Sequence, residues 1–175
     1  MIKQLLLIVV AIIAIIALRA AFIPADFRVE RSITVQAPPE RIFPLLNDFQ
    51  QFSQWSPWEK LDPAMAKQIS TPSAGTGAVY EWRGNAKAGS GRMEILSSKP
   101  SDSVRVKLDF LKPIESHNIT DYTLTPSGTG TTVTWAMHGP STFPSKVMQV
   151  FVSMDKLVGG DFERGLASLK AVAEK

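Results

Sequence analysis

The chain has 175 residues, a formal net charge of +3, two histidines and no cysteine. The length suits one domain, and the absence of cysteine excludes disulfides, thiolate-bound metals and cysteine nucleophiles. Two histidines exclude an all-histidine zinc site but leave a mixed histidine and carboxylate site open. The apolar content of 45% is too high for a disordered protein, so we expect a globular chain. We also expect no metal and no cofactor.

The first 23 residues form the most apolar part of the chain. Twenty of them are apolar, and the run from Leu5 to Leu18 is unbroken. A helix from Ile2 to Ile23 would be about 33 Å long, which is enough to cross a hydrocarbon core of about 30 Å. Residues 1–23 are therefore predicted to be a transmembrane anchor.

A cleavable signal peptide is the competing interpretation of this segment. It needs small residues three and one positions before the cut, but cleavage after Ala20 places Leu18 at the first of these, and cleavage one residue later places an arginine there. We therefore favour an uncleaved, single-pass anchor. Lys3 favours a cytoplasmic N-terminus, whereas Arg19, Arg28 and Arg31 favour the opposite orientation. We expect the cytoplasmic N-terminus, which puts the domain on the extracytoplasmic side of the cell membrane.

A short juxtamembrane linker, residues 24–27, and one domain, residues 28–175, are expected after the anchor. Without Lys3 and Arg19 the chain has 17 basic and 16 acidic residues, so the domain is almost neutral. A near-neutral domain without a basic stripe argues against nucleic-acid binding.

Period-two alternation of apolar and polar residues predicts about seven strands. The expected strands are Phe27–Ala37, Ala66–Ser70, Ala78–Arg83, Arg92–Ser98, Val104–Leu111, Glu115–Thr125 and Thr131–His138. Glycine or proline closes most of them, and short turns between strands indicate an antiparallel meander. Arg31 interrupts the apolar side of the first strand, which leaves room for a buried partner that the sequence does not identify.

Two short helical segments and one long helix complete the expected elements. A short helix begins near Pro39 and a second helical turn covers Phe49–Gln54, while an apolar stripe predicts one long helix over Ser145–Glu174. Gly159 and Gly160 lie inside that helix and should bend it or let another element approach closely. The pattern is that of an α+β domain whose long helix covers the concave face of the sheet.

Several phrases of the sequence resemble those of a known superfamily. They are "ITVQAPPERIFPLLNDF", "WSPWEKLDP", "GTGAVYEWRGN", "GSGRMEI", "GTGTTVTWAMHG" and "GGDFERGLASLK". Their order resembles the START-like helix-grip superfamily, also called SRPBCC, and in particular its polyketide cyclase/dehydrase and lipid transport group. The resemblance covers Phe27 to Lys175. It implies a curved, seven-stranded antiparallel sheet around a long C-terminal helix, with an apolar cavity between them that binds lipids or other hydrophobic molecules.

Alternation within the strands predicts which side chains face that cavity. We expect the ligand-binding residues to be Tyr80, Trp82, Met93, Leu108, Phe110, Tyr122, Trp135, Met137, Phe151 and Met154. Large aromatic side chains with polar tips, together with an apolar wall, are typical of small-molecule sites. Trp55 and Trp58 are candidates for the cavity mouth, and a purely structural role for them is equally open.

No catalytic constellation is predicted. His117 and Asp121 alternate with Tyr122, so they should face solvent if Tyr122 faces the cavity, and His138 opposes Trp135 in the same way. We expect a membrane-tethered protein that binds a hydrophobic small molecule or lipid without catalysis. A cyclase/dehydratase-like lyase and a co-chaperone-like interaction module remain as alternatives, and the sequence does not determine the oligomeric state.

Overall fold

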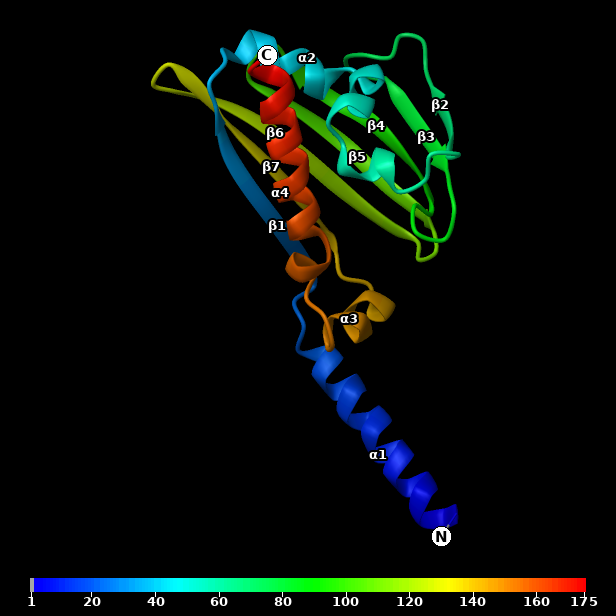
Figure 1. Ribbon diagram of the computed structural model, residues 1–175. Helices are drawn as coiled ribbons and strands as arrows, with labels where there is room; N and C mark the ends of the chain where they lie inside the picture. The colour runs from blue at the N-terminus through cyan, green and yellow to red at the C-terminus, as the bar shows by residue number, and fades with distance from the viewer. Residues whose placement is uncertain (1) are drawn as a thin grey trace.

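The computed structural model describes residues 2–175 (Figure 1). Met1, the first residue of the expected anchor, lies outside the described residues. The helical elements are α1 (Ile2–Ala21), α2 (Pro39–Asn47), η1 (Phe49–Gln54), η2 (Pro57–Lys60), α3 (Phe143–Gln149) and α4 (Met154–Ala173). The strands are β1 (Asp26–Val35), β2 (Ala66–Ile69), β3 (Val79–Arg83), β4 (Ser90–Lys99), β5 (Ser103–Lys112), β6 (Ser116–Ser127) and β7 (Gly130–Pro140).

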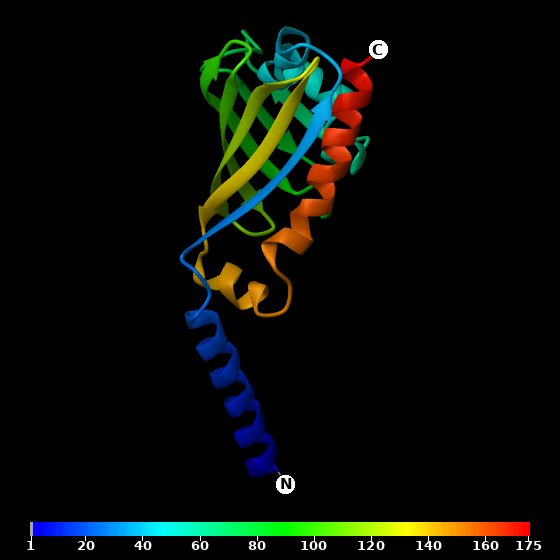
Figure 2. The same cartoon turned by 90° about the vertical axis from the view of Figure 1, so that its left-hand side faces the viewer.

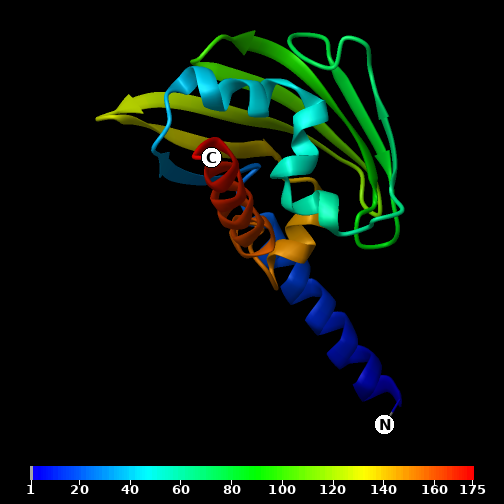
Figure 3. The ribbon, with the colours of Figure 1, turned by 45° about the horizontal axis from the view of Figure 1, so that its top comes forward.

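All seven strands form one antiparallel sheet in the order β1-β7-β6-β5-β4-β3-β2. From β2 onward each strand pairs with the next along the chain, and β1 joins the sheet beside β7. The sheet curves strongly, and α2, η1, η2 and α4 lie on its concave side (Figures 2 and 3). The predicted α+β fold, a seven-stranded antiparallel sheet with a C-terminal helix on its concave face, is confirmed.

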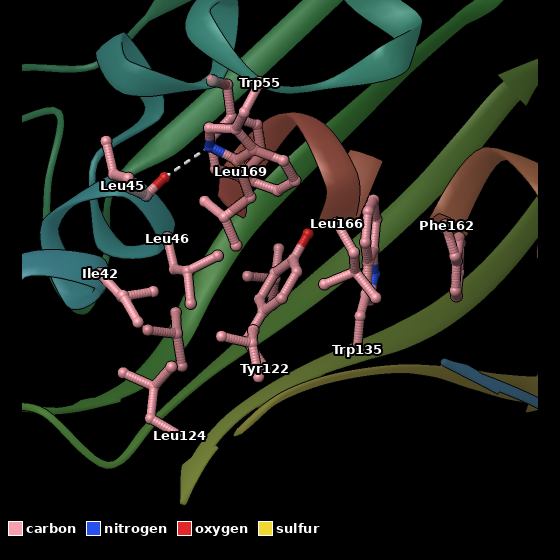
Figure 4. Close-up of a cluster of buried hydrophobic side chains, with 14 of the residues drawn as sticks. Ile42, Leu45, Leu46, Trp55, Tyr122, Leu124, Trp135, Phe162, Leu166 and Leu169 are labelled. Atoms are coloured by element: carbon pink, nitrogen blue, oxygen red, sulfur yellow. Dashed lines mark hydrogen bonds between the residues drawn. The ribbon is translucent and has the colours of Figure 1, made fainter. Parts of the chain in front are cut away.

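The concave face is packed against apolar side chains of α2 and α4 (Figure 4). Ile42 and Leu46 in α2 and Phe162, Leu166 and Leu169 in α4 are all at most 2% exposed. Their spacing of three and four residues places them on one face of each helix. Burial of this face fixes α4 across the sheet. The same apolar spacing allowed the packing of the C-terminal helix on the sheet to be predicted from the sequence.

The expected single helix over Ser145–Glu174 is wrong, because the chain forms two helices there. The segment 150–153 separates α3 from α4. Ser153 has an extended backbone, and its side-chain oxygen accepts a hydrogen bond from the backbone N–H of Lys156 at 3.3 Å. An N-cap of this kind satisfies a free N–H group and defines the start of α4. The apolar spacing continued across the break, so periodicity alone did not reveal it.

The glycine pair in α4 permits a close approach by β1. A Cβ atom on Gly159 would lie 2.4 Å from a guanidinium nitrogen of Arg31, whereas one on Gly160 would have no neighbour closer than 3.4 Å. The Arg31 guanidinium is 2.8 Å from an Asp155 oxygen and 2.7 Å from a Glu163 oxygen. The partners of Arg31 are thus exposed carboxylates of α4 rather than buried groups, and they hold the pKa of Arg31 above its usual value.

Helix α1 is long and apolar enough to cross a membrane, and it extends away from the domain (Figure 1). Most of its large side chains are exposed, but Ala20 in its last turn is fully buried. α1 contacts α3 at this end. α1 ends at Ala21 and β1 begins at Asp26, so residues 22–25 connect the helix to the sheet, two residues earlier than the expected linker of residues 24–27.

Candidate functional site

A mainly apolar cavity lies between the sheet, the short helices η1 and η2, and α4. The residues that line it are Phe52, Trp55, Ser56, Trp58, Glu59, Met65, Tyr80, Trp82, Ala88, Met93, Val106, Leu108, Phe110, Thr120, Tyr122, Trp135, Met137 and Phe162. Its volume is about 90 Å³, counted as room for the centres of water-sized molecules. A single water needs about 10–15 Å³ by this measure, so the cavity has room for a small organic group.

The structure places most of the expected ligand-binding residues on this cavity. Eight of the ten line it, namely Tyr80, Trp82, Met93, Leu108, Phe110, Tyr122, Trp135 and Met137. Trp55 and Trp58 line it as well. The expectation for Phe151 is wrong, because this residue lies in the break between α3 and α4 and is 69% exposed. Met154, in the first turn of α4, packs against the core but is not among the lining residues.

A cluster of aromatic rings forms the wall nearest α4. The ring of Trp135 stacks on that of Phe162, with centroids 4.3 Å apart and planes 6° apart, and Trp55 and Trp58 pack edge-on against Trp135. Gly165 of α4 makes this possible, since a Cβ atom there would lie 2.7 Å from the Trp135 ring. The wall is therefore tightly packed and preformed.

Two buried polar atoms of the cavity wall have no hydrogen-bond partner within residues 2–175. They are the hydroxyl oxygen of Thr120 and the indole nitrogen of Trp135. The other buried indoles are satisfied, because Trp55 donates to the carbonyl of Leu45 at 2.8 Å (Figure 4) and Trp82 donates to that of Ala88 at 3.0 Å. Leaving a buried polar group unpaired lowers the stability of the fold by about 1–3 kcal/mol. Both groups are therefore suited to form a hydrogen bond with a polar group of a bound molecule.

Tyr122 adds a third polar group to the cavity wall. It is 4% exposed and lies on the same strand as Thr120, opposite Trp135 in the pairing of β6 with β7. Burial raises the pKa of its phenol above the usual value. A phenol is protonated at neutral pH even at the ordinary pKa of 10.0, so Tyr122 can donate a hydrogen bond to a ligand.

Glu59 is the one carboxylate on the cavity wall among the described residues, and it was not anticipated from the sequence. Its side chain is 9% exposed, accepts a hydrogen bond from the Tyr80 hydroxyl at 2.5 Å, and forms an ion pair with Lys67. Burial, and then the bond to Glu59, raises the pKa of Tyr80. Glu59 directly follows Trp58 in η2, and its position beside this candidate for the cavity mouth is the sequence signal that could have indicated it.

The histidines lie away from the cavity, as their alternation with Tyr122 and Trp135 predicted. His117 pairs with Asp109 at 2.8 Å and His138 with Asp121 at 3.1 Å, and neither histidine lines the cavity. Asp121 also pairs with Arg105. Burial opposes ionisation of Asp121, but Arg105 and His138 outweigh it and lower the pKa. These contacts are cross-strand pairs between β5 and β6 and between β6 and β7, away from the cavity. Residues 2–175 contain no group of three or more potential metal-ligating His, Asp or Glu side chains.

Comparison with protein families identifies what this architecture is. The family described as polyketide cyclase / dehydrase and lipid transport matches residues 26–174, which is the whole of the sheet and its helices. The chain belongs to this family. The match begins after α1, so the apolar helix is an addition to the polyketide cyclase / dehydrase domain. No curated protein matches the sequence.

Several solved structures of other proteins have the same fold as this chain. A protein of Chromobacterium violaceum, CV1439, has a TM-score of 0.57 at 19% identity, over 87% of this chain and 99% of its own. The Aha1 dimer of Colwellia psychrerythraea has a TM-score of 0.58 at 18% identity, over 85% and 96%. DynU16, a putative protein from the dynemicin biosynthetic locus, has a TM-score of 0.56 at 20% identity, over 85% and 47%. At these identities the likeness shows the fold alone.

Proposed function

We propose that the protein binds a small hydrophobic molecule or lipid in this cavity, without catalysis, while α1 tethers it to a membrane. The observation that carries the proposal is an apolar cavity whose wall holds unpartnered polar atoms of Thr120 and Trp135. A ligand with an apolar body and an oxygen-containing group would fill the cavity and satisfy both. The family description, which includes lipid transport, supports this class of ligand.

The tether is supported by α1. Its 20 residues rise about 30 Å, and its large apolar side chains are exposed to the surroundings of the protein rather than packed in the core. Exposure of such side chains to water is unfavourable, whereas a bilayer accepts them. We place the domain on the extracytoplasmic side, because Lys3 favours a cytoplasmic N-terminus.

Blocking the cavity tests the binding role. Leu108 lines the cavity, and Leu108→Trp would occupy its volume. Leu96→Trp is the matched control, since Leu96 is 40% exposed on the neighbouring strand β4 and does not line the cavity. Titration with a fluorescent fatty acid should give saturable binding for the wild type and Leu96→Trp and loss of binding for Leu108→Trp. Equal binding by all three proteins would exclude the cavity as the site, and no binding by any would reject the proposal.

An enzymatic role is the second candidate, and Glu59 favours it. A cyclising dehydration needs a base that removes a proton next to a carbonyl and a donor that protonates the departing hydroxyl. Glu59 and Tyr80 lie together on the cavity wall as such a pair. In a poly-β-keto thioester, attack of the deprotonated carbon on a distant ketone closes a ring and creates the hydroxyl that then leaves as water. Incubation with such a thioester, followed by mass spectrometry, would show loss of one water by the wild type but not by Glu59→Gln if this candidate is correct. The binding role predicts no such product from either protein.

A further inference from the structure

Helix α3 lies at the end of the domain to which α1 is attached (Figures 1 and 2). α3 contacts α1, and Ala20 in the last turn of α1 is fully buried. The backbone N–H of Ser141, just before α3, donates to the carbonyl of Ala25, just before β1, at 2.6 Å. These contacts hold α3 at the level of the C-terminal end of α1.

The length of α1 determines the depth at which α3 would lie. A helix of 20 residues rises about 30 Å, which is the thickness of the hydrocarbon core, so a spanning α1 uses its whole length to cross it. The last turn, with Arg19, would therefore lie at the boundary between acyl chains and headgroups, where arginine side chains reach the polar region. Because α3 packs against this turn, it would lie at the same boundary.

The surface of this region is suited to such a boundary. Phe143 at the start of α3 is 62% exposed, and Phe151 in the following break is 69% exposed. Lys146 and Lys156 lie on α3 and the start of α4, and the nearby Asp155 is paired with Arg31. Exposed phenylalanines beside lysines are the side chains with which proteins bind a membrane interface that carries negative charge.

We propose that α3 and residues 150–153 form a lipid contact, in which Phe143 and Phe151 insert into the headgroup boundary of the bilayer that α1 crosses. This inference rests on the proposed tether. The occupant is a lipid surface rather than another protein, because the last turn of α1 and the exposed phenylalanines share one level of the molecule.

The cavity occupies the half of the sheet nearest this contact. The pairs Asp26–Pro140 and Phe110–Ser116 mark the end of the sheet beside α1. The cavity residues Phe110 and Met137 lie at or near this end, whereas Val35 and Val133, toward the opposite end, do not line the cavity. The proposed contact therefore lies at the end of the sheet that also holds the cavity.

Site-specific fluorescence quenching tests the contact. The chain has no cysteine, so a single introduced cysteine can carry an environment-sensitive fluorophore. The full chain would be labelled through Phe151→Cys, through Ile12→Cys in the middle of α1, or through Leu96→Cys on β4 as the exposed control. Each protein would be reconstituted in vesicles of phosphatidylethanolamine and phosphatidylglycerol that contain either headgroup-level or acyl-chain spin labels.

The contact predicts that headgroup-level spin labels remove most of the fluorescence at position 151, that acyl-chain spin labels remove it at position 12, and that position 96 is unaffected. Quenching at position 12 without quenching at position 151 would overturn the lipid contact and leave the tether intact. Absence of quenching at all three positions would overturn the tether and the contact together. Equal quenching at positions 151 and 96 would show general adsorption of the domain to the bilayer and would also overturn the inference.

Discussion

Thr120 and Thr131 provide a matched pair at the scale of the residue. Both are buried threonines of the sheet, but the Thr131 hydroxyl donates to the carbonyl of Ala37 at 2.8 Å, whereas that of Thr120 has no partner. Thr131→Val should lower the free energy of unfolding by about 1–3 kcal/mol, because it leaves a buried carbonyl unpaired. Thr120→Val should leave it unchanged or raise it.

Urea unfolding of the two variants checks this difference. The same Thr120→Val protein should bind a fluorescent fatty acid more weakly than the wild type, if the hydroxyl contacts the polar group of the ligand. Equal destabilisation by both substitutions would mean that Thr120 has a partner in the empty protein, and would remove one of the two polar groups on which the binding proposal depends.

The two buried tyrosines predict a loss of stability at alkaline pH. The pKa values of Tyr80 and Tyr122 are raised above the ordinary value of 10.0. Above pH 10 the unfolded chain loses phenolic protons that the folded chain retains, so this contribution is complete below pH 10 and is lost as the pH rises further. Each tyrosine should contribute a fall of about 1.4 kcal/mol per pH unit in the free energy of unfolding.

Tyr122→Phe should remove one of these contributions. Urea unfolding at a series of pH values above 10 should therefore show a shallower decline for Tyr122→Phe than for the wild type. The difference between the proteins isolates the tyrosine from the lysines that titrate in the same range. Parallel declines would mean that the phenol of Tyr122 ionises as freely in the folded protein as in the unfolded chain.

At the scale of the element, the adjacent glycines of α4 should respond differently to alanine. Alanine is favoured over glycine in a helix by about 0.5–1 kcal/mol, and Gly160→Ala should gain this amount because its Cβ atom would meet only an ordinary contact, 3.4 Å from the Arg164 guanidinium. Gly159→Ala should gain less or lose, because the added Cβ atom displaces the guanidinium of Arg31. Thermal unfolding of both variants measures the difference, and a larger gain at Gly159 would contradict the packing described for β1 and α4.

The sequence predicted the elements of the sheet better than those of the C-terminal region. Alternation such as that of Val104–Leu111 depends only on which side of a strand is buried, so seven strands could be located from it. The break between α3 and α4 depends instead on the Ser153 cap at the start of α4 and on contacts between α3 and α1, and neither produces a periodic signal. Phe151 was therefore assigned to an apolar helix face, although it lies in the break.

At the scale of the whole molecule, most of the cavity wall could be predicted but its polar groups could not. Strand residues such as Leu108 and Met137 follow from alternation. Glu59 belongs to a short helical turn without periodicity, and its position beside Tyr80 depends on how η2 packs against β3. Whether a buried hydroxyl or indole has a partner likewise depends on neighbours distant in the sequence, so the unpaired groups of Thr120 and Trp135 became evident only in the folded structure.

The central claim is that the cavity holds a hydrophobic molecule while α1 holds the protein at a membrane. Native mass spectrometry of the full chain, purified in lipid nanodiscs from the cells that produce it, tests this claim most directly. We expect one small hydrophobic molecule per chain in the wild type and in Leu96→Trp, and its loss in Leu108→Trp. An empty wild-type protein that also takes up no fluorescent fatty acid, or a molecule retained unchanged by Leu108→Trp, would contradict the account.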